Sequence, residues 1–177
     1  MSGIIGDNSG RSSGVIATTV AADPTYVDFP GTQVSSASVN RLDDYEEGTF
    51  TPVVTAASGN DHVHFVKAGF YTKVGNIVTV DCHWVHYQQN ASSGNVTITG
   101  FPFVSGDWAD HTPVFNWGYC TSAAITAGSS FMGYMGRNSS YVTMFTWDAT
   151  GGGTNTQFSE IPSYVTMAFA GTYQTNT

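Results

Sequence analysis

The strongest constraint on the fold is a two-residue alternation between Asn76 and Tyr87. Its apolar members occupy every second position, and they are Val78, Val80, Cys82 and Trp84. Successive side chains of a β-strand point to opposite faces, so this pattern predicts a strand with one buried face. Gly75 and Asn76 both accept the positive φ of a tight two-residue turn. The sequence therefore predicts a hairpin that joins strands over Val63–Val74 and Asn76–Tyr87.

The rest of the chain after Gly48 has the same character, with short apolar segments separated by turn residues. Further strands are predicted over Thr49–Ala56, Asn95–Thr99, Pro113–Thr121, Ser130–Met135, Ser140–Trp147 and Tyr164–Tyr173. Turns are predicted at Arg137–Ser139 and Thr150–Asn155. No stretch has a sustained helical period. About eight short strands with turns between them predict an all-β domain, a β-sandwich or jelly roll.

The first 44 residues differ from the rest, because Gly, Ser, Ala and Thr dominate and apolar residues are few. Glycine loses too much backbone entropy to hold a helix or a strand alone. A pure linker would nevertheless lack the apolar residues Ile4, Ile5, Val15 and Ile16. We predict two parts: an extended arm over residues 1–44, whose apolar side chains fit a groove on another subunit, and a head domain over residues 45–177. A disordered tail is the alternative interpretation of the arm.

Charge excludes several classes of partner. Charged residues make up 10% of the 177 residues, the net charge is −8, and the five basic residues form no cluster. Because phosphate binding needs several cations on one face, the sequence predicts no nucleic-acid partner. The same argument, and the absence of an apolar run near about 20 residues, predicts no membrane partner. So little charge suits a surface that is partly hidden in an oligomer.

Four segments carry a resemblance to a known family through their order and spacing. They are Asp44–Pro52, Tyr71–Val80, Gly94–Phe103 and Phe169–Tyr173. Together they resemble the C-terminal β-domain of bacteriophage tail-fibre and tail-spike proteins, over about residues 44–177. The resemblance implies a homotrimeric virion protein whose β-sandwich head contacts host surface polysaccharide. Since the arm is too short for a fibre shaft, it also implies docking on another virion protein, with the four apolar residues of the arm as the anchor.

A polar loop between Ser105 and His111 is the candidate glycan site. It holds Trp108 with Asp107 and Asp110 on either side. Sugars stack their C–H faces on aromatic rings and donate hydroxyl hydrogens to carboxylates, and a core tryptophan would rarely lie among aspartates. Burial of Trp108 under a loop or at a subunit interface is the alternative. Tyr134, Tyr141 and Trp147 are interpreted as packing residues.

Metal and redox chemistry have weaker support. His62 with His64, and Asp81 with His83, each share a strand face, but structural zinc normally needs four ligands, so we predict no metal site and no cofactor. A histidine cluster on a trimer axis stays open. Cys82 lies on the apolar side of its strand and is predicted to be a core residue. A disulfide between Cys82 and Cys120 is open, although no feature of the sequence requires one.

Catalysis is not predicted. Glycoside hydrolysis needs two carboxylates about 5–10 Å apart across a cleft, and the sequence does not indicate such a pair. Four acidic residues cluster where the arm joins the head, and a negatively charged linker or a subunit contact explains them more simply: Asp43, Asp44, Glu46 and Glu47. The leading hypothesis is a short receptor-binding fibre of the virion. A decoration protein of the capsid or baseplate that stabilises the particle is the structural alternative, and a surface-glycan hydrolase is the enzymatic one.

Overall fold

The computed structural model describes residues 45–58, 63–88, 92–148 and 151–176. The predictions for the arm, with Ile4, Ile5, Val15 and Ile16, and for His62 fall outside these residues. The elements are β1 (Tyr45–Phe50), β2 (Val53–Ser58), β3 (Val63–Val74), β4 (Ile77–Gln88), β5 (Ser93–Thr99), β6 (Val114–Thr121), β7 (Ser130–Met135), β8 (Val142–Asp148), β9 (Gly152–Asn155), the short 3₁₀ helix η1 (Phe158–Glu160) and β10 (Thr166–Gln174). The predicted all-β fold is confirmed.

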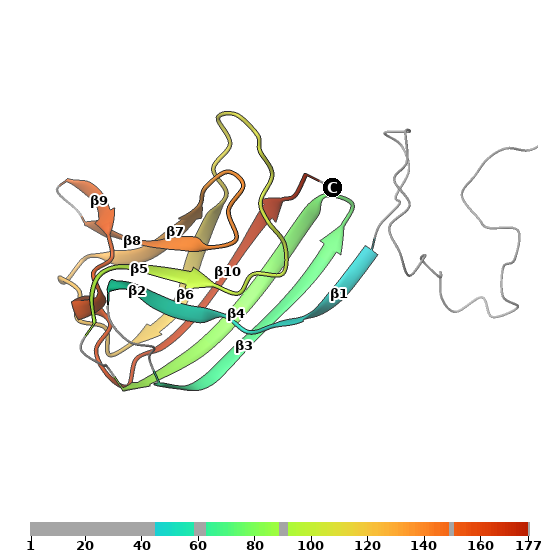
Figure 1. Ribbon diagram of the computed structural model, residues 1–177. Coiled ribbons are helices and arrows are strands. Elements are labelled where there is room, and N and C mark those ends of the chain that lie inside the picture. Colours follow the sequence, from blue (N-terminus) through green and yellow to red (C-terminus); the bar gives the residue numbers. More distant parts are fainter. Residues whose placement is uncertain (1–44, 59–62, 89–91, 149–150, 177) are drawn as a thin grey trace, which may run out of the picture.

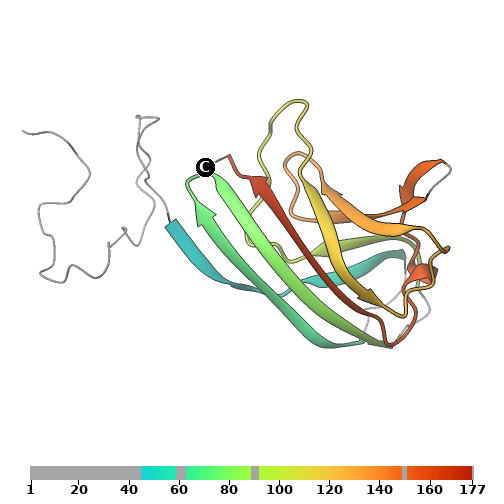
Figure 2. The same cartoon turned by 180° about the vertical axis from the view of Figure 1, so that it is seen from behind.

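The strands form one antiparallel sheet in the order β1-β3-β4-β10-β6-β7-β8-β5-β2, and β9 pairs with β8. The sheet curls into a half-barrel, so that β2, β5 and β8 face β4, β10 and β6 across one interior (Figure 1). Figure 2 shows the long strands β3, β4 and β10 side by side on the opposite wall. The core therefore lies between two halves of a single continuous sheet.

The predicted alternation of β4 is confirmed, since its four inward side chains are at most 1% exposed. Phe169 on β10 continues this core, because its ring lies 5.9 Å from the Trp84 ring and stacks on Trp117 at 4.7 Å. Phe101 and Phe115 complete the contacts around it, with ring centroids 5.6 Å apart. Aromatic rings remove the largest apolar area from water, so this cluster dominates the stability of the domain.

Two predicted segments were wrong in detail. Thr49–Ala56 is not one strand, because the chain leaves β1 at Thr51 and Pro52 and enters β2 at the other edge of the sheet. Proline cannot donate to a strand ladder, which suits this crossing. The predicted turn Thr150–Asn155 contains β9, whose Gly153 lies under the Phe145 ring, where an added Cβ would come within 1.8 Å.

Both described ends of the head lie at the same end of the sheet. Tyr45 pairs with Val74, and Gln174 pairs with Ile77, on either side of the β3–β4 turn. Of the two turn residues, Gly75 alone has a positive φ, of 60°. We call this the terminal end of the domain. The far end is defined by the first residues of β3 and the last residues of β4.

Candidate functional site

The loop that carries Trp108 is pinned at the terminal end by backbone hydrogen bonds to two other segments. Ser105 N–H donates to the Ser139 carbonyl at 2.9 Å, and Gly106 N–H donates to the Gln174 carbonyl at 2.7 Å. The Ser105 hydroxyl donates to the Gly136 carbonyl at 2.6 Å and accepts from Ser139 N–H at 3.0 Å. The turn between β7 and β8 and the end of β10 therefore fix the position of this loop.

Asp107 is tied to the same segments through its side chain. One carboxylate oxygen accepts from Arg137 Nε at 2.8 Å and from Nη2 at 2.5 Å, and the Asp107 amide donates to Asn176 Oδ1 at 2.8 Å. The bonds from Arg137, with a further bond from Asn138, hold the pKa of Asp107 below its ordinary value. The ion pair is about half exposed, so its main effect is to orient the loop.

Trp108 lies at the surface, with 45% of the residue exposed. Its indole folds back over Gly106, where an added Cβ would lie 2.0 Å from the indole Nε1. Because Gly106 has no side chain, the indole can occupy this position, and part of the ring remains exposed to solvent. This placement fits the predicted glycan contact, which stays a prediction.

Asp110 lies apart from the hydrogen-bond network of Asp107. Its φ is 61°, a conformation that aspartate adopts more readily than most residues, and it is exposed. Its carboxylate has no hydrogen-bond or ion-pair partner among the described residues. The structure thus leaves Asp110 open to a ligand, whereas Asp107 already binds Arg137.

The same loop forms one wall of an open hollow of about 510 Å³ on the outer face of β4, β10 and β6. Its lining is Thr79, His111, Thr112, Pro113, Val114, Asn116, Ala170, Gly171 and Thr172. The polar groups are hydroxyls, one amide and one imidazole, and no carboxylate or amine takes part. Such a hollow suits a small neutral ligand with hydroxyl groups. The sequence analysis missed it, because its residues come from separate segments that meet only through strand pairing.

Three aromatic residues interpreted as packing residues are in fact exposed. Tyr134 is 36% exposed, Tyr141 46% and Trp147 49%. Tyr134 and Trp147 lie on the strands β7 and β8, and Tyr141 directly precedes β8. The interpretation of Trp84 as a core residue is confirmed, because it is fully buried. Exposed rings are therefore more frequent on this domain than the sequence pattern predicts.

Metal ligands do not converge in the described part of the chain, where no group of three or more His, Cys, Asp or Glu could hold an ion. His64 packs against His86, with ring centroids 5.4 Å apart. Cys82 and Cys120 are free thiols, and burial raises the pKa of both. Over the described residues, no helix has the length and hydropathy needed to cross a membrane.

Comparisons with known proteins point to one architecture. No protein-family model matches the sequence, and no curated protein matches it. The fold is similar to part of the Dettilon tailspike protein (gp208), a crystal structure with a TM-score of 0.65 and 21% sequence identity. The match covers 73% of this chain and 24% of the tailspike chain, so this chain spans about a quarter of the length of that protein. The head domain thus has the fold of a segment of a phage tail protein.

Proposed function

We propose that this protein is a component of a bacteriophage virion, a short tail-fibre-like protein that binds the host through surface glycans. The observation that carries the proposal is the likeness of the head domain to a segment of a tailspike. The composition agrees with it, since an acidic domain with few cations suits a neutral polysaccharide better than a nucleic acid or an anionic lipid. The role we propose is binding without hydrolysis.

The arm supplies the attachment in this proposal. The chain before Tyr45 joins the head at the terminal end, where β10 also ends. Ile4, Ile5, Val15 and Ile16 would then bind another virion protein of the tail, the baseplate or the capsid. Three copies of the head would assemble as a homotrimer, in which several weak glycan sites bind together more tightly than one alone.

The loop at Trp108 is one glycan contact of this proposal. The exposed part of the indole would stack on a sugar ring, and the Asp110 carboxylate would accept hydrogen bonds from sugar hydroxyls. Asp107 would act through Arg137 by holding the loop in place. The neighbouring hollow, with the His111 imidazole and several hydroxyls, would receive an adjoining sugar.

Binding of the purified full chain to host cells tests the proposal. Added host surface polysaccharide should compete the binding away, and Trp108→Ala should weaken it by about tenfold, the loss expected for one aromatic contact and its buried area. Trp147→Ala is the matched control, because Trp147 is similarly exposed but lies on β8. Tight binding to stripped particles without any binding to cells would instead identify a decoration protein.

Gold-labelled antibody against the head domain locates the protein on whole phage particles. Label at the tail tip or baseplate supports receptor binding. Label spread over the head of the particle contradicts it and supports the decoration protein. Light scattering of the purified chain tests the trimer, and a stable monomer would contradict that part of the proposal.

A further inference from the structure

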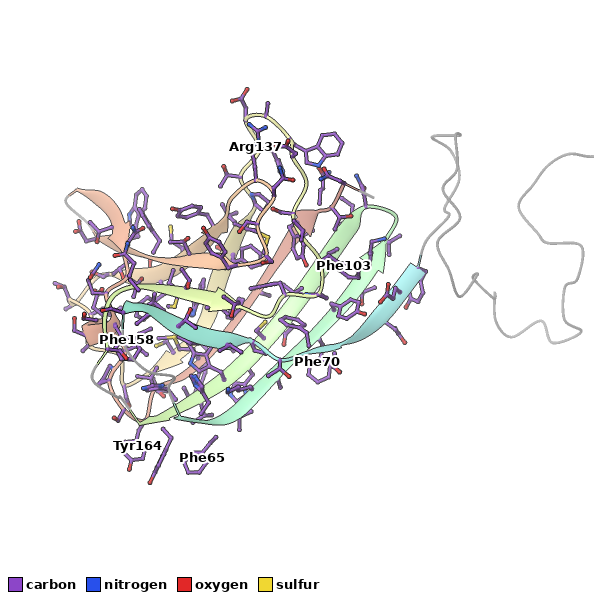
Figure 3. The ribbon with its side chains drawn as sticks, viewed as in Figure 1. Phe65, Phe70, Phe103, Arg137, Phe158 and Tyr164 are labelled. Atoms are coloured by element: carbon purple, nitrogen blue, oxygen red, sulfur yellow. The ribbon has the colours of Figure 1, made fainter. Side chains whose placement is uncertain are left out.

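A second group of exposed rings lies at the far end of the domain. Phe65 on β3, Tyr87 on β4 and Tyr164 before β10 meet there, and we call these three residues the aromatic corner. The centroids of Phe65 and Tyr87 are 4.4 Å apart, and those of Tyr87 and Tyr164 are 5.3 Å apart. Phe65 is 69% exposed and Tyr164 63% exposed. Figure 3 shows these two rings projecting from the lower corner of the domain, with Arg137 at the opposite, upper side.

The backbone is irregular on both sides of the aromatic corner. The pairing of β3 with β4 shifts register between His64 and Val66, so Phe65 is the extra residue of a bulge. Bulges redirect a side chain and are frequent beside functional sites. Tyr164 has a φ of 68°, which is strained for a bulky residue and recurs where function requires it. The bulge at Phe65 and the positive φ of Tyr164 are two independent irregularities of the backbone, and each lies at an exposed ring.

The aromatic corner has a shape and an area that suit a small ligand better than a second protein. The Tyr87 and Tyr164 rings stand at 89°, and Phe65 is tilted by 59° to Tyr87, so the rings form an angle instead of a flat face. Three partly exposed aromatic side chains offer on the order of 300 Å². A stable contact with a second copy of the chain needs about 800 Å² from each partner. One or two sugar units match the smaller area.

The chemistry of the aromatic corner also favours a neutral sugar. Its polar groups are the hydroxyls of Tyr87 and Tyr164, and the interaction with Tyr87 raises the pKa of Tyr164. None of its three side chains is ionised at neutral pH, and the whole chain carries a net charge of −8, which disfavours an anionic ligand. Aromatic faces with hydroxyls at their rim match the C–H faces and hydroxyl groups of a saccharide.

The aromatic corner and the loop at Trp108 lie at opposite ends of the domain. The loop is bonded to the last residues of β10, at the terminal end, where the arm would lead to the particle. The aromatic corner lies at the other end of β3 and β4. We infer that the aromatic corner is a saccharide-binding surface directed away from the particle, and that it takes a neutral sugar unit between Phe65 and Tyr164. The inference rests on the proposed function for the orientation and for the class of ligand.

The test uses the purified full chain and a printed array of bacterial surface polysaccharides. Phe65→Ala and Tyr164→Ala should each weaken binding to the polysaccharide that the unmodified chain selects by about tenfold. Phe70→Ala is the matched control, since Phe70 is 57% exposed on the same strand but outside the aromatic corner, and it should change binding less than about twofold.

Tyr164→Gly distinguishes a binding role from a structural one. Glycine accepts the positive φ of this position without strain, so the variant should melt at or above the temperature of the unmodified chain while it loses the same binding as Tyr164→Ala. A clear fall in melting temperature would mean that the ring stabilises the fold, and the inference would be wrong.

The remaining outcomes separate this inference from the proposed function. Binding by the unmodified chain that Phe65→Ala and Tyr164→Ala leave intact overturns the inference and keeps the proposed function. An unmodified chain that binds no polysaccharide of the array counts against both. A change of oligomeric state in the two variants, with glycan binding intact, would assign the aromatic corner to contact between copies.

Discussion

Replacement of Gly100 by alanine probes the crossing that carries the chain from one edge of the sheet to the other. Gly100 follows β5 with a φ of 88°, and an added Cβ would lie 2.2 Å from the carbonyl oxygen of Thr51, in the segment between β1 and β2. Two costs therefore act together. A non-glycine residue in such a conformation costs about 1–3 kcal/mol. Relief of the overlap requires a backbone shift of the kind that costs about 1–3 kcal/mol in overpacked sites.

Two other glycines separate these costs. Gly75 has a φ of 60° but no atom within 4 Å of an added Cβ, so Gly75→Ala carries the conformational cost alone. Gly118 has neither feature, so Gly118→Ala should raise the free energy of unfolding by about 0.4–1 kcal/mol, because alanine restricts the unfolded chain. The same restriction offsets about 0.4–1 kcal/mol of the cost in each of the other two variants. We expect losses of about 2–5 kcal/mol for Gly100→Ala and about 1 kcal/mol for Gly75→Ala.

Urea unfolding followed by tryptophan fluorescence measures the three free energies. The slope with denaturant should be the same for all variants, because the surface exposed on unfolding does not change. Equal losses for Gly100→Ala and Gly75→Ala would refute the reasoning. They would mean that the carbonyl of Thr51 does not press on residue 100, and that the crossing between β1 and β2 takes another path.

Three further predictions follow from individual contacts. Phe169→Ala should lower the free energy of unfolding by about 3–5 kcal/mol, measured in the same assay, because the ring is 2% exposed and packs against several others. Arg137→Ala should raise the pKa of Asp107 toward its ordinary value in an NMR titration, while the bond from Asn138 still lowers it in part. Since the folded pKa is lowered, the stability lost in this variant should be greatest at neutral pH and should vanish as the pH falls through the folded pKa. In a Cys120→Ala chain, Cys82 should react with a thiol reagent only after unfolding, because it is buried and burial raises its pKa; rapid labelling of the folded chain would contradict its place in the core.

A strand can be predicted from the sequence when its own residues alternate between apolar and polar side chains. The alternation of β4 is local, so its buried face can be assigned from the order of its residues alone. The boundary between β1 and β2 cannot, because the chain changes edge there and the two strands share one continuous polar and apolar pattern. Gly152–Asn155 has no β pattern, and its strand β9 exists only through pairing with β8.

The candidate site likewise has features that local sequence predicts and features that depend on long-range contacts. Trp108 could be predicted to lie at the surface, because polar neighbours flank it in the sequence. Tyr164 could not be recognised, since neither its positive φ nor its contact with Tyr87 leaves a local signal. The hollow beside His111 also depends on long-range pairing, which places β10 between β4 and β6.

The order of strands decides which surface is available to a receptor. Because β10 pairs with β4, and β4 with β3, the start of β3, the end of β4 and the residues before β10 must all lie at one end. The same pairings place Tyr45 and Gln174 at the other end. Any protein joined to the domain through the chain before Tyr45 would be joined at the end that also holds the loop of Trp108. The far end lies away from that junction, and there the bulged backbone at Phe65 and the strained backbone at Tyr164 carry two exposed rings.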